Sequence, residues 1–256
     1  MKGLREVGMI KTARDVLLFK ISKRTIMVVS CDSAGGIGSK QHDVVKVDPK
    51  TIGRFTARVA LMEALSVGAT PLCLSNTLPV EPQRTGKEIV RGIRGELKDS
   101  GLNPGIPMVQ STEKNIRVSQ TGVGVTVIGL ADKESLKIRR CKAGDAVVAI
   151  GLPQVGAEVI TGERRRRIAD TRDVRRLLDQ PFVHEVIPVG SQGILHEART
   201  VASDSNLEFK LRRDLKIDVA KSAGPGTTIL CVLAQEDAEK LSEIFPKPVN
   251  PIGALA

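Results

Sequence analysis

The sequence predicts an α+β protein built from two lobes, and three observations support this fold class. Predicted strands exceed what one doubly wound sheet needs. A charged stretch at residues 132–142 separates two regions that each mix strands with helices. The chain has 256 residues, enough for one large domain or two modest ones. We therefore place an N-terminal domain at residues 1–135 and a C-terminal αβ domain at residues 136–256.

The first half is predicted to contain a hairpin, two helices and further strands. Apolar β-branched runs predict hairpin strands at 15–21 and 24–30. Apolar residues at positions 52, 55, 59 and 62 form one face of a helix over 50–67, which Pro49 begins and Gly68 ends. A second helix over 84–100 ends at Gly101. The other predicted strands are 44–47, 72–78, 107–110 and 121–131.

The second half is predicted to alternate strands with helices. The helices are expected over 158–178, 194–202 and 235–245, and the first carries a dense run of arginines between residues 164 and 176. Such a run is typical of a solvated helix face, with phosphate binding as the sharper alternative. The predicted strands are 145–151, 184–189, 207–211 and 227–234.

Composition limits the partners of the chain. A net charge of +10 favours anionic partners. The chain has no Trp, no Tyr and only five Phe, which argues against nucleic acid because single-strand binders stack bases on aromatic side chains. The sequence shows neither a membrane-spanning run nor a secretory signal. Its four cysteines lack metal-ligand spacing, so we expect reduced thiols in the core. We expect a cytoplasmic protein without a membrane partner.

The stretch from Met27 to Gly38 organises the candidate site. An apolar strand leads to the carboxylate of Asp32, and Gly35, Gly36 and Gly38 follow at once. Glycines let backbone N–H groups approach a phosphate, and a carboxylate beside them can bind the cation that neutralises it. A simple turn capped by Asp32 is the alternative.

Further charged residues lie at the ends of predicted elements in the first half. Carboxylates that gather Mg²⁺ around a triphosphate, with lysines that balance the phosphate charge, are what phosphoryl transfer requires. Glu63 lies beside the apolar helix face with no basic neighbour at helical spacing, so either a bound metal or solvent must balance its charge. The common phosphate-loop, protein-kinase and dinucleotide motifs are absent. The acids are Asp15, Asp32, Asp43, Glu63 and Glu113, and the lysines are Lys40, Lys46 and Lys114.

Residues 53–72, GRFTARVALMEALSVGATPL, resemble the helix and G-A-x-P segment of the aminoimidazole ribonucleotide (AIR) synthetase superfamily. That group includes thiamine-monophosphate kinase, selenophosphate synthetase and a hydrogenase maturation factor. Residues 29–33 resemble its metal-binding strand end, and residues 122–129 resemble its closing strand. Within the superfamily, residues 31–38, 43–47, 55–63 and 111–113 are most similar to the α-ribazole kinases of cobalamin lower-ligand salvage.

The resemblance implies an enzyme that transfers the γ-phosphate of ATP to the 5′-hydroxyl of α-ribazole, with Mg²⁺ as cofactor. It also implies a homodimer whose first-half strands pair across the two-fold axis into a β-barrel, with ATP bound near that interface. The implied metal ligands are Asp15, Asp32, Glu63 and Glu113. The implied ATP-binding residues are Gly35, Gly36, Gly38, Lys40, Asn76, Thr112 and Lys114. The implied catalytic residues are Asp32, Lys46 and Asp43, the last as an optional general base.

The chain departs from the superfamily pattern at several positions. Met62-Glu63 stands where many relatives have Asn-Asp, and Glu113 is chosen from a tract that differs from the usual Gly-Gly-acid-Thr. Two alternatives therefore stay open. One is another enzyme of the superfamily, either similar to thiamine-monophosphate kinase or a cyclo-ligase. The other is a basic dimer that binds RNA through residues 164–176.

Overall fold

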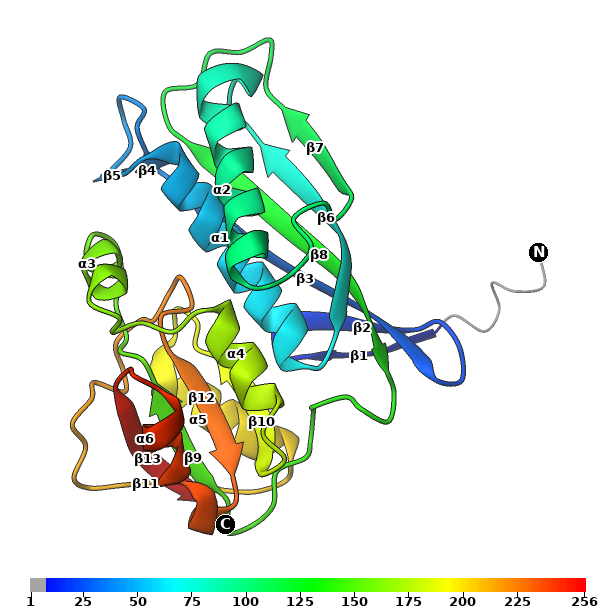
Figure 1. Cartoon of the computed structure of the whole chain (residues 1–256), viewed down its shortest axis with the longest axis vertical. Helices are drawn as coiled ribbons and strands as arrows, with labels where there is room; N and C mark the ends of the chain where they lie inside the picture. Colours follow the sequence, from blue (N-terminus) through cyan, green and yellow to red (C-terminus); the bar gives the residue numbers. More distant parts are fainter. Residues whose placement is uncertain (1–7) are drawn as a thin grey trace. The chain divides into compact units, whose positions relative to one another are not determined.

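The computed structural model describes residues 8–256, which divide into two compact units (Figure 1). The first unit holds the described residues up to Leu65 together with Ala69–Leu136. The second holds Ser66–Gly68 and Lys137–Ala256. Each unit has its own sheet and its own helices, which confirms the predicted α+β class.

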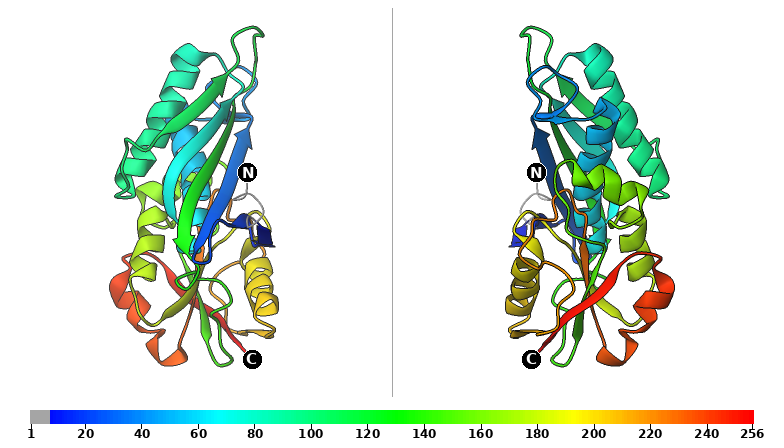
Figure 2. Two further views of the ribbon diagram at one scale, coloured as in Figure 1. Left: turned by 90° about the vertical axis from the view of Figure 1, so that its right-hand side faces the viewer. Right: turned by 90° about the vertical axis from the view of Figure 1, so that its left-hand side faces the viewer.

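The first unit is built on a six-stranded sheet with the order β1-β2-β3-β8-β6-β7. All neighbouring strands are antiparallel except β6 and β7, which run parallel. Helices α1 and α2 lie on one face of this sheet (Figure 2). Buried and half-buried residues alternate along β8, as expected of a strand with one covered face. The bounds are β1 (Gly8–Ala13), β2 (Val16–Lys20), β3 (Thr25–Gly35), α1 (Pro49–Ser66), β6 (Thr70–Leu78), α2 (Lys87–Asp99), β7 (Met108–Thr112) and β8 (Gly122–Asp132).

Strand β3 is longer than the sequence predicts. The apolar run stops near Ser30, but the strand continues to Gly35 because β8 pairs with it along its whole length, from Thr25 opposite Asp132 to Gly35 opposite Gly122. After β3 the chain forms a small parallel pair, β4 (Ile37–Gly38) and β5 (Val45–Lys46), and then enters α1. Asp32 therefore lies within a paired strand instead of at its end.

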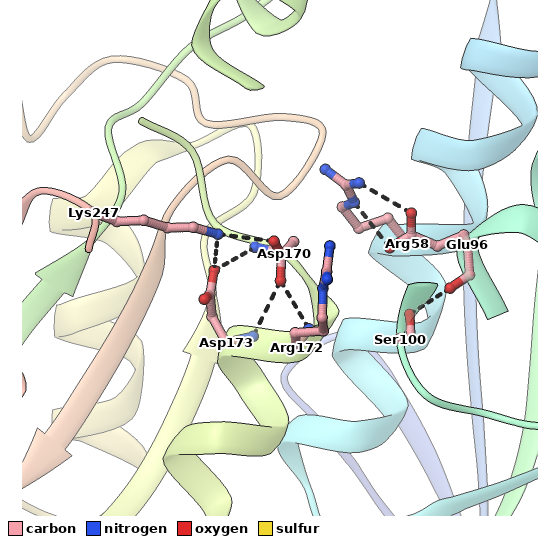
Figure 3. Close-up of polar contacts among 7 residues, drawn as sticks. All are labelled: Arg58, Glu96, Ser100, Asp170, Arg172, Asp173 and Lys247. Atoms are coloured by element: carbon pink, nitrogen blue, oxygen red, sulfur yellow. Dashed lines mark hydrogen bonds and ion pairs between the residues drawn. The ribbon is translucent and has the colours of Figure 1, made fainter. Parts of the chain in front are cut away.

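Helices α1 and α2 approach each other closely at two glycines. A Cβ atom on Gly53 would lie 2.2 Å from the carbonyl oxygen of Ile89, and one on Gly92 would lie 2.0 Å from that of Lys50. One ion pair also joins the helices: Nε and a terminal nitrogen of Arg58 each donate to one oxygen of Glu96 at 3.0 Å (Figure 3). These two side chains are only 5% and 1% exposed, so the pair is enclosed between the helices.

The second unit contains an antiparallel five-stranded sheet with the order β10-β12-β9-β13-β11. Helix α5 packs on one face through Ile194, Ala198 and Val201. Helices α4 and α6 lie on the other face (Figure 2). The bounds are β9 (Ala146–Ile150), α3 (Glu158–Arg164), α4 (Thr171–Leu178), β10 (Val183–Pro188), α5 (Gly193–Asp204), β11 (Phe209–Leu211), β12 (Ile229–Leu233), α6 (Lys240–Ile244) and β13 (Val249–Leu255).

Several predicted elements of the second unit are corrected by the structure. The helix predicted over 158–178 is two helices, because Asp170 ends the connection and caps α4 by accepting from the backbone N–H groups of Arg172 and Asp173. The helix predicted over 235–245 is a short turn, η3 (Gln235–Asp237), followed by α6. Strand β13 was not predicted, since Pro251 and Gly253 disfavour strands, and its pairing with β9 shifts register between these two residues.

Among the described residues, no helix has both the length and the apolar character that crossing a bilayer demands.

Adding a methyl group at Gly92 tests the helix contact. We expect Gly92→Ala to lower the free energy of unfolding by about 1–3 kcal/mol, because the new Cβ would overlap the Lys50 backbone. The matched control is Gly95→Ala in the same helix, whose Cβ would have no atom within 4 Å and should raise stability by up to about 1 kcal/mol. Urea unfolding measures both changes. Equal effects of the two substitutions would contradict the close approach.

Candidate functional site

Asp32 is a partly buried carboxylate on the helix-covered face of the first sheet. It lies two residues after Ser30 and so on the same face of β3. The Ser30 hydroxyl donates to the carbonyl oxygen of Ala60 in α1 at 2.6 Å. Burial raises the pKa of Asp32 to about 6, and a hydrogen bond from the Ser33 backbone only partly offsets this. A carboxylate that is costly to ionise in this place would gain from a bound cation.

Asn76 lies on the same face as Asp32. Val125 in β8 pairs with Asp32 of β3 on one side and with Asn76 of β6 on the other. Residues paired across antiparallel strands point to the same face, so the two polar side chains flank Val125 at about 10 Å, two strand spacings apart. Asn76 is 1% exposed, and neither atom of its amide has a hydrogen-bond partner among the described residues. A buried amide without partners costs about 1–3 kcal/mol, which the polar atoms of a ligand would offset.

The loop between β3 and α1 is held in place by Asp43. One oxygen of this carboxylate accepts from the Thr121 backbone N–H at 2.7 Å. The other accepts from the Thr121 hydroxyl and the Lys40 backbone N–H, both at 2.7 Å. Burial alone would raise the pKa of Asp43, but these hydrogen bonds and the charge of Lys46 hold it below its usual value. Both oxygens are therefore engaged in holding the loop, and a general-base role for Asp43 stays a prediction.

Two of the three glycines are required by the path of the loop. Gly36 has φ +69° and Gly38 has φ +152°. A Cβ on Gly38 would also lie 2.4 Å from the Thr121 hydroxyl oxygen, so no other residue fits there. Gly35 belongs to β3 and would have no atom within 4 Å of an added Cβ. Contact of these glycines with a nucleotide stays a prediction.

The lysines of the loop have partners of their own. Lys40 forms an ion pair with Glu81 at 2.6 Å, and Glu81 also accepts from the Thr85 hydroxyl at 2.5 Å. Burial alone would raise the pKa of Glu81, but these contacts hold it below its usual value. Lys46 donates to the carbonyl oxygens of Lys40 and Gln41. Sequence patterns carry no signal for Glu81, because its partner lies 41 positions away in the chain.

The predicted carboxylates do not gather into one cluster. Asp15 is exposed in the turn between β1 and β2. Glu63 is buried in α1, beyond Ala60 toward the C-terminal end of the helix. Asp32 follows Ser30 in β3, and β3 leads through the loop to the N-terminal end of α1. Asp32 therefore lies toward the N-terminal end of α1, whereas Glu63 lies toward its C-terminal end. No group of three His, Cys, Asp or Glu side chains in the described part of the chain could hold a metal ion.

The other predicted residues lie at the end of β7. Glu113 follows Thr112, the last residue of β7, and accepts from the backbone N–H groups of Asn115 and Ile116 at 2.7 and 3.0 Å. These hydrogen bonds hold the pKa of Glu113 below its usual value. Lys114 is exposed in the same loop. The local contacts explain Glu113 as a loop-stabilising residue, and binding roles for Thr112, Glu113 and Lys114 stay predictions.

The donor set fits one kind of Mg²⁺ site and not another. A cage of four protein carboxylates is not assembled by the described residues. Mg²⁺ is commonly held by one or two carboxylates, while substrate phosphates and water complete its shell. Asp32, with its raised pKa, and the unpartnered amide of Asn76 fit this second arrangement.

A pocket of about 600 Å³ lies in the second unit between the β11–β13 edge and the segment η3–α6. Its charged lining residues are Lys210, Arg212, Glu236 and Glu239. None of the predicted site residues lines it, and its lining does not indicate a role.

Comparison with protein families matches residues 13–131 to the family described as "AIR synthase related protein, N-terminal domain". The match covers most of the first unit and somewhat under half of the whole chain. No curated protein matches the sequence.

Solved structures resemble the chain over both units. Thiamine-monophosphate kinase from Stenotrophomonas maltophilia has 18% identity and a TM-score of 0.61, with 95% of this chain and 89% of that chain covered. Hydrogenase maturation protein HypE in complex with ATP has 17% identity and a TM-score of 0.63, with 90% and 76% covered. T. maritima PurL complexed with ADP has 14% identity and a TM-score of 0.63, with 99% and 44% covered. These likenesses establish an AIR-synthetase-like α+β fold.

The pH dependence of stability tests the environment of Asp32. Its pKa is about 6 in the fold against 3.8 for an unperturbed Asp, so between these values the folded state binds more protons than the unfolded state. Stability should therefore fall as pH rises through this window. From about pH 5 to about pH 7, wild type should lose about 1 kcal/mol more than Asp32→Asn in urea unfolding. Parallel pH profiles of the two proteins would show that Asp32 is solvated.

Proposed function

We propose that this chain is an ATP-dependent kinase that phosphorylates an alcohol group of a nucleoside-like small molecule, with α-ribazole as the first candidate acceptor. The match of residues 13–131 to the AIR synthase related domain supports ATP use. So do structural neighbours that include a kinase, a complex with ATP and a complex with ADP. The observation that carries the proposal is the pair formed by Asp32 and Asn76 across Val125.

Each residue of the pair has a proposed task in binding Mg²⁺-ATP. The Asp32 carboxylate would bind the ion, which when present neutralises phosphate charge. The Asn76 amide can both donate and accept, so it suits a phosphate oxygen or a water of the ion. Catalysis in such a site consists mostly of positioning and charge stabilisation, which requires no strong general base. This agrees with the engagement of Asp43 in loop contacts.

The β3–α1 loop would border the phosphates. Asp43 holds its backbone, Gly36 and Gly38 allow its path, and the Lys40 side chain contributes positive charge that Glu81 keeps in place. Lys46 stabilises the loop through two carbonyl oxygens, so we assign it a positioning role. Further binding roles are proposed for Asp15, Gly35, Glu63, Thr112, Glu113 and Lys114.

A homodimer is part of the proposal. Helices α1 and α2 leave the opposite face of the first sheet without a helix among the described residues of this unit (Figure 2), and β2, β6 and β7 carry exposed large apolar side chains. Leu17 is 38% exposed, Leu72 is 47% exposed and Val109 is 67% exposed. Pairing two such faces would bury this apolar surface, as in the barrel implied by the resemblance.

A kinase assay with purified protein tests the activity. We expect wild type with Mg²⁺-ATP to convert α-ribazole into a product heavier by one phosphoryl group, read by mass spectrometry. Asp32→Asn should slow this reaction about 100-fold or more, because it removes a charge that stabilises the phosphates and their ion. Asp99→Asn, at the exposed end of α2, is the matched control and should leave the rate unchanged. Full activity of Asp32→Asn would rule out this assignment.

The same assay separates the kinase from its relatives. A kinase keeps the transferred phosphate on its product, whereas a cyclo-ligase releases both ADP and inorganic phosphate. Thiamine monophosphate belongs in the acceptor panel because one structural neighbour is a thiamine-monophosphate kinase. Substrate-dependent ADP release identifies the acceptor, and inorganic phosphate release identifies a ligase.

Replacing Asn76 separates a binding role from a structural one. Asn76→Leu exchanges an unpartnered buried amide for an apolar group of similar size, so the free energy of unfolding should stay the same or rise. Loss of an interaction with the nucleotide should raise KM for Mg²⁺-ATP about tenfold, equivalent to about 1.4 kcal/mol. Urea unfolding and steady-state kinetics measure the two effects. A variant that loses stability while KM stays constant would identify Asn76 as structural.

A further inference from the structure

A dense group of arginines on the second unit lies outside the set of residues proposed for the kinase site. It extends from the end of α3, through the connection, and along α4. All seven side chains are exposed. We refer to this group as the arginine surface, and its members are Arg164, Arg165, Arg166, Arg167, Arg172, Arg175 and Arg176.

Two aspartates within this segment, Asp170 and Asp173, pair with a lysine from elsewhere in the second unit. Lys247 forms ion pairs with Asp170 at 2.9 Å and with Asp173 (Figure 3). Its side chain is only 9% exposed, so this pairing is enclosed by the fold. Asp170 and Asp173 also complete a reciprocal capping box with backbone N–H groups at the start of α4. Their negative charge is therefore largely balanced by Lys247 and by the backbone N–H groups at the start of α4.

Most of the arginine surface has no carboxylate partner. Among the described residues, six of the seven arginines, all but Arg175, make no ion pair within 4.0 Å. Repulsion among so many like charges disfavours the folded state unless counter-charge comes from outside. The other six arginines thus form a cationic region without carboxylate partners among the described residues, which an anionic partner would stabilise.

The fold presents these arginines on a defined scaffold. In α4, Val174 and Leu177 are buried, so Arg172, Arg175 and Arg176 share the outer side at helical spacing. The guanidinium of Arg176 lies over the Phe245 ring at 5.8 Å from its centroid. The remaining four arginines follow one another at the end of α3.

We infer that the arginine surface binds the phosphodiester backbone of duplex RNA. The guanidinium group donates two parallel hydrogen bonds to phosphate, and its further N–H groups can donate to the neighbouring 2′-hydroxyl. Ile168, Val174 and Leu177 are buried, so the segment lacks the exposed apolar side chains that would insert into a membrane. It also lacks an aromatic residue for stacking unpaired bases, which favours a duplex over a single strand.

The experiment measures binding to a fluorescein-labelled RNA duplex of about 20 base pairs by fluorescence anisotropy, between about 50 and 200 mM KCl. The test variant replaces Arg164, Arg165, Arg166 and Arg167 with Gln. Binding should weaken at least about tenfold at the lowest salt, and the salt slope should shrink by about 0.9 for each phosphate that the variant no longer neutralises. The control variant replaces four exposed cations elsewhere, Lys23, Lys87, Lys98 and Arg213, with Gln and should bind within about twofold of wild type.

Further measurements decide between this inference and its rivals. Unchanged ATP turnover in the test variant, together with weakened RNA binding, supports a surface separate from the kinase site. Equal weakening in the test and control variants would attribute binding to net charge and overturn the inference. Tighter binding of a DNA duplex of the same length would overturn the assignment to RNA. Absence of RNA binding by wild type at the lowest salt would overturn it as well, including where vesicles of anionic lipid bind instead.

Discussion

The pairing of β3 with β8 is the constraint on which the first unit depends. The paired residues run from Thr25 opposite Asp132 to Gly35 opposite Gly122. This pairing positions the polar groups of the candidate site. It sets Asp32 beside Val125, and Val125 in turn sets Asn76 through β6. Just before β8 it brings Thr121 to the carboxylate of Asp43. A shift of one residue would turn Asp32 to the opposite face, so register and site are specified together.

Local patterns were sufficient to predict much of the fold. The spacing of Ile52, Phe55, Val59 and Met62 predicted α1, and all of them are buried except Val59, which is half-buried. Where prediction failed, a tertiary contact outweighed a local preference. Strand β13 forms despite Pro251 because it fills a place between β9 and β11. The helix over 158–178 divides because Ile168 enters the core and Asp170 starts a new helix.

The candidate site was predictable residue by residue but not as an assembly. A strand or helix pattern indicates which way a side chain points, so Asp32 and Asn76 could be identified as polar groups on apolar elements. It does not give the separation between elements, and Glu63 therefore lies in the other direction along α1 from Asp32. Partners that are distant in the chain, such as Glu81 for Lys40, leave no periodic signal. The structure adds these partners and, with them, identifies the residues that hold the loop.

The enclosed ion pair of Arg58 and Glu96 limits how this protein can diverge. Loss of either partner alone leaves an uncompensated charge between two helices, at a cost of about 3–5 kcal/mol, comparable to much of the stability of a small domain. An apolar pair of similar volume could replace both without that penalty. Descendants of this sequence should therefore change both positions together or keep both. A consensus design that chooses the two residues independently could leave one buried charge without its partner and lose stability.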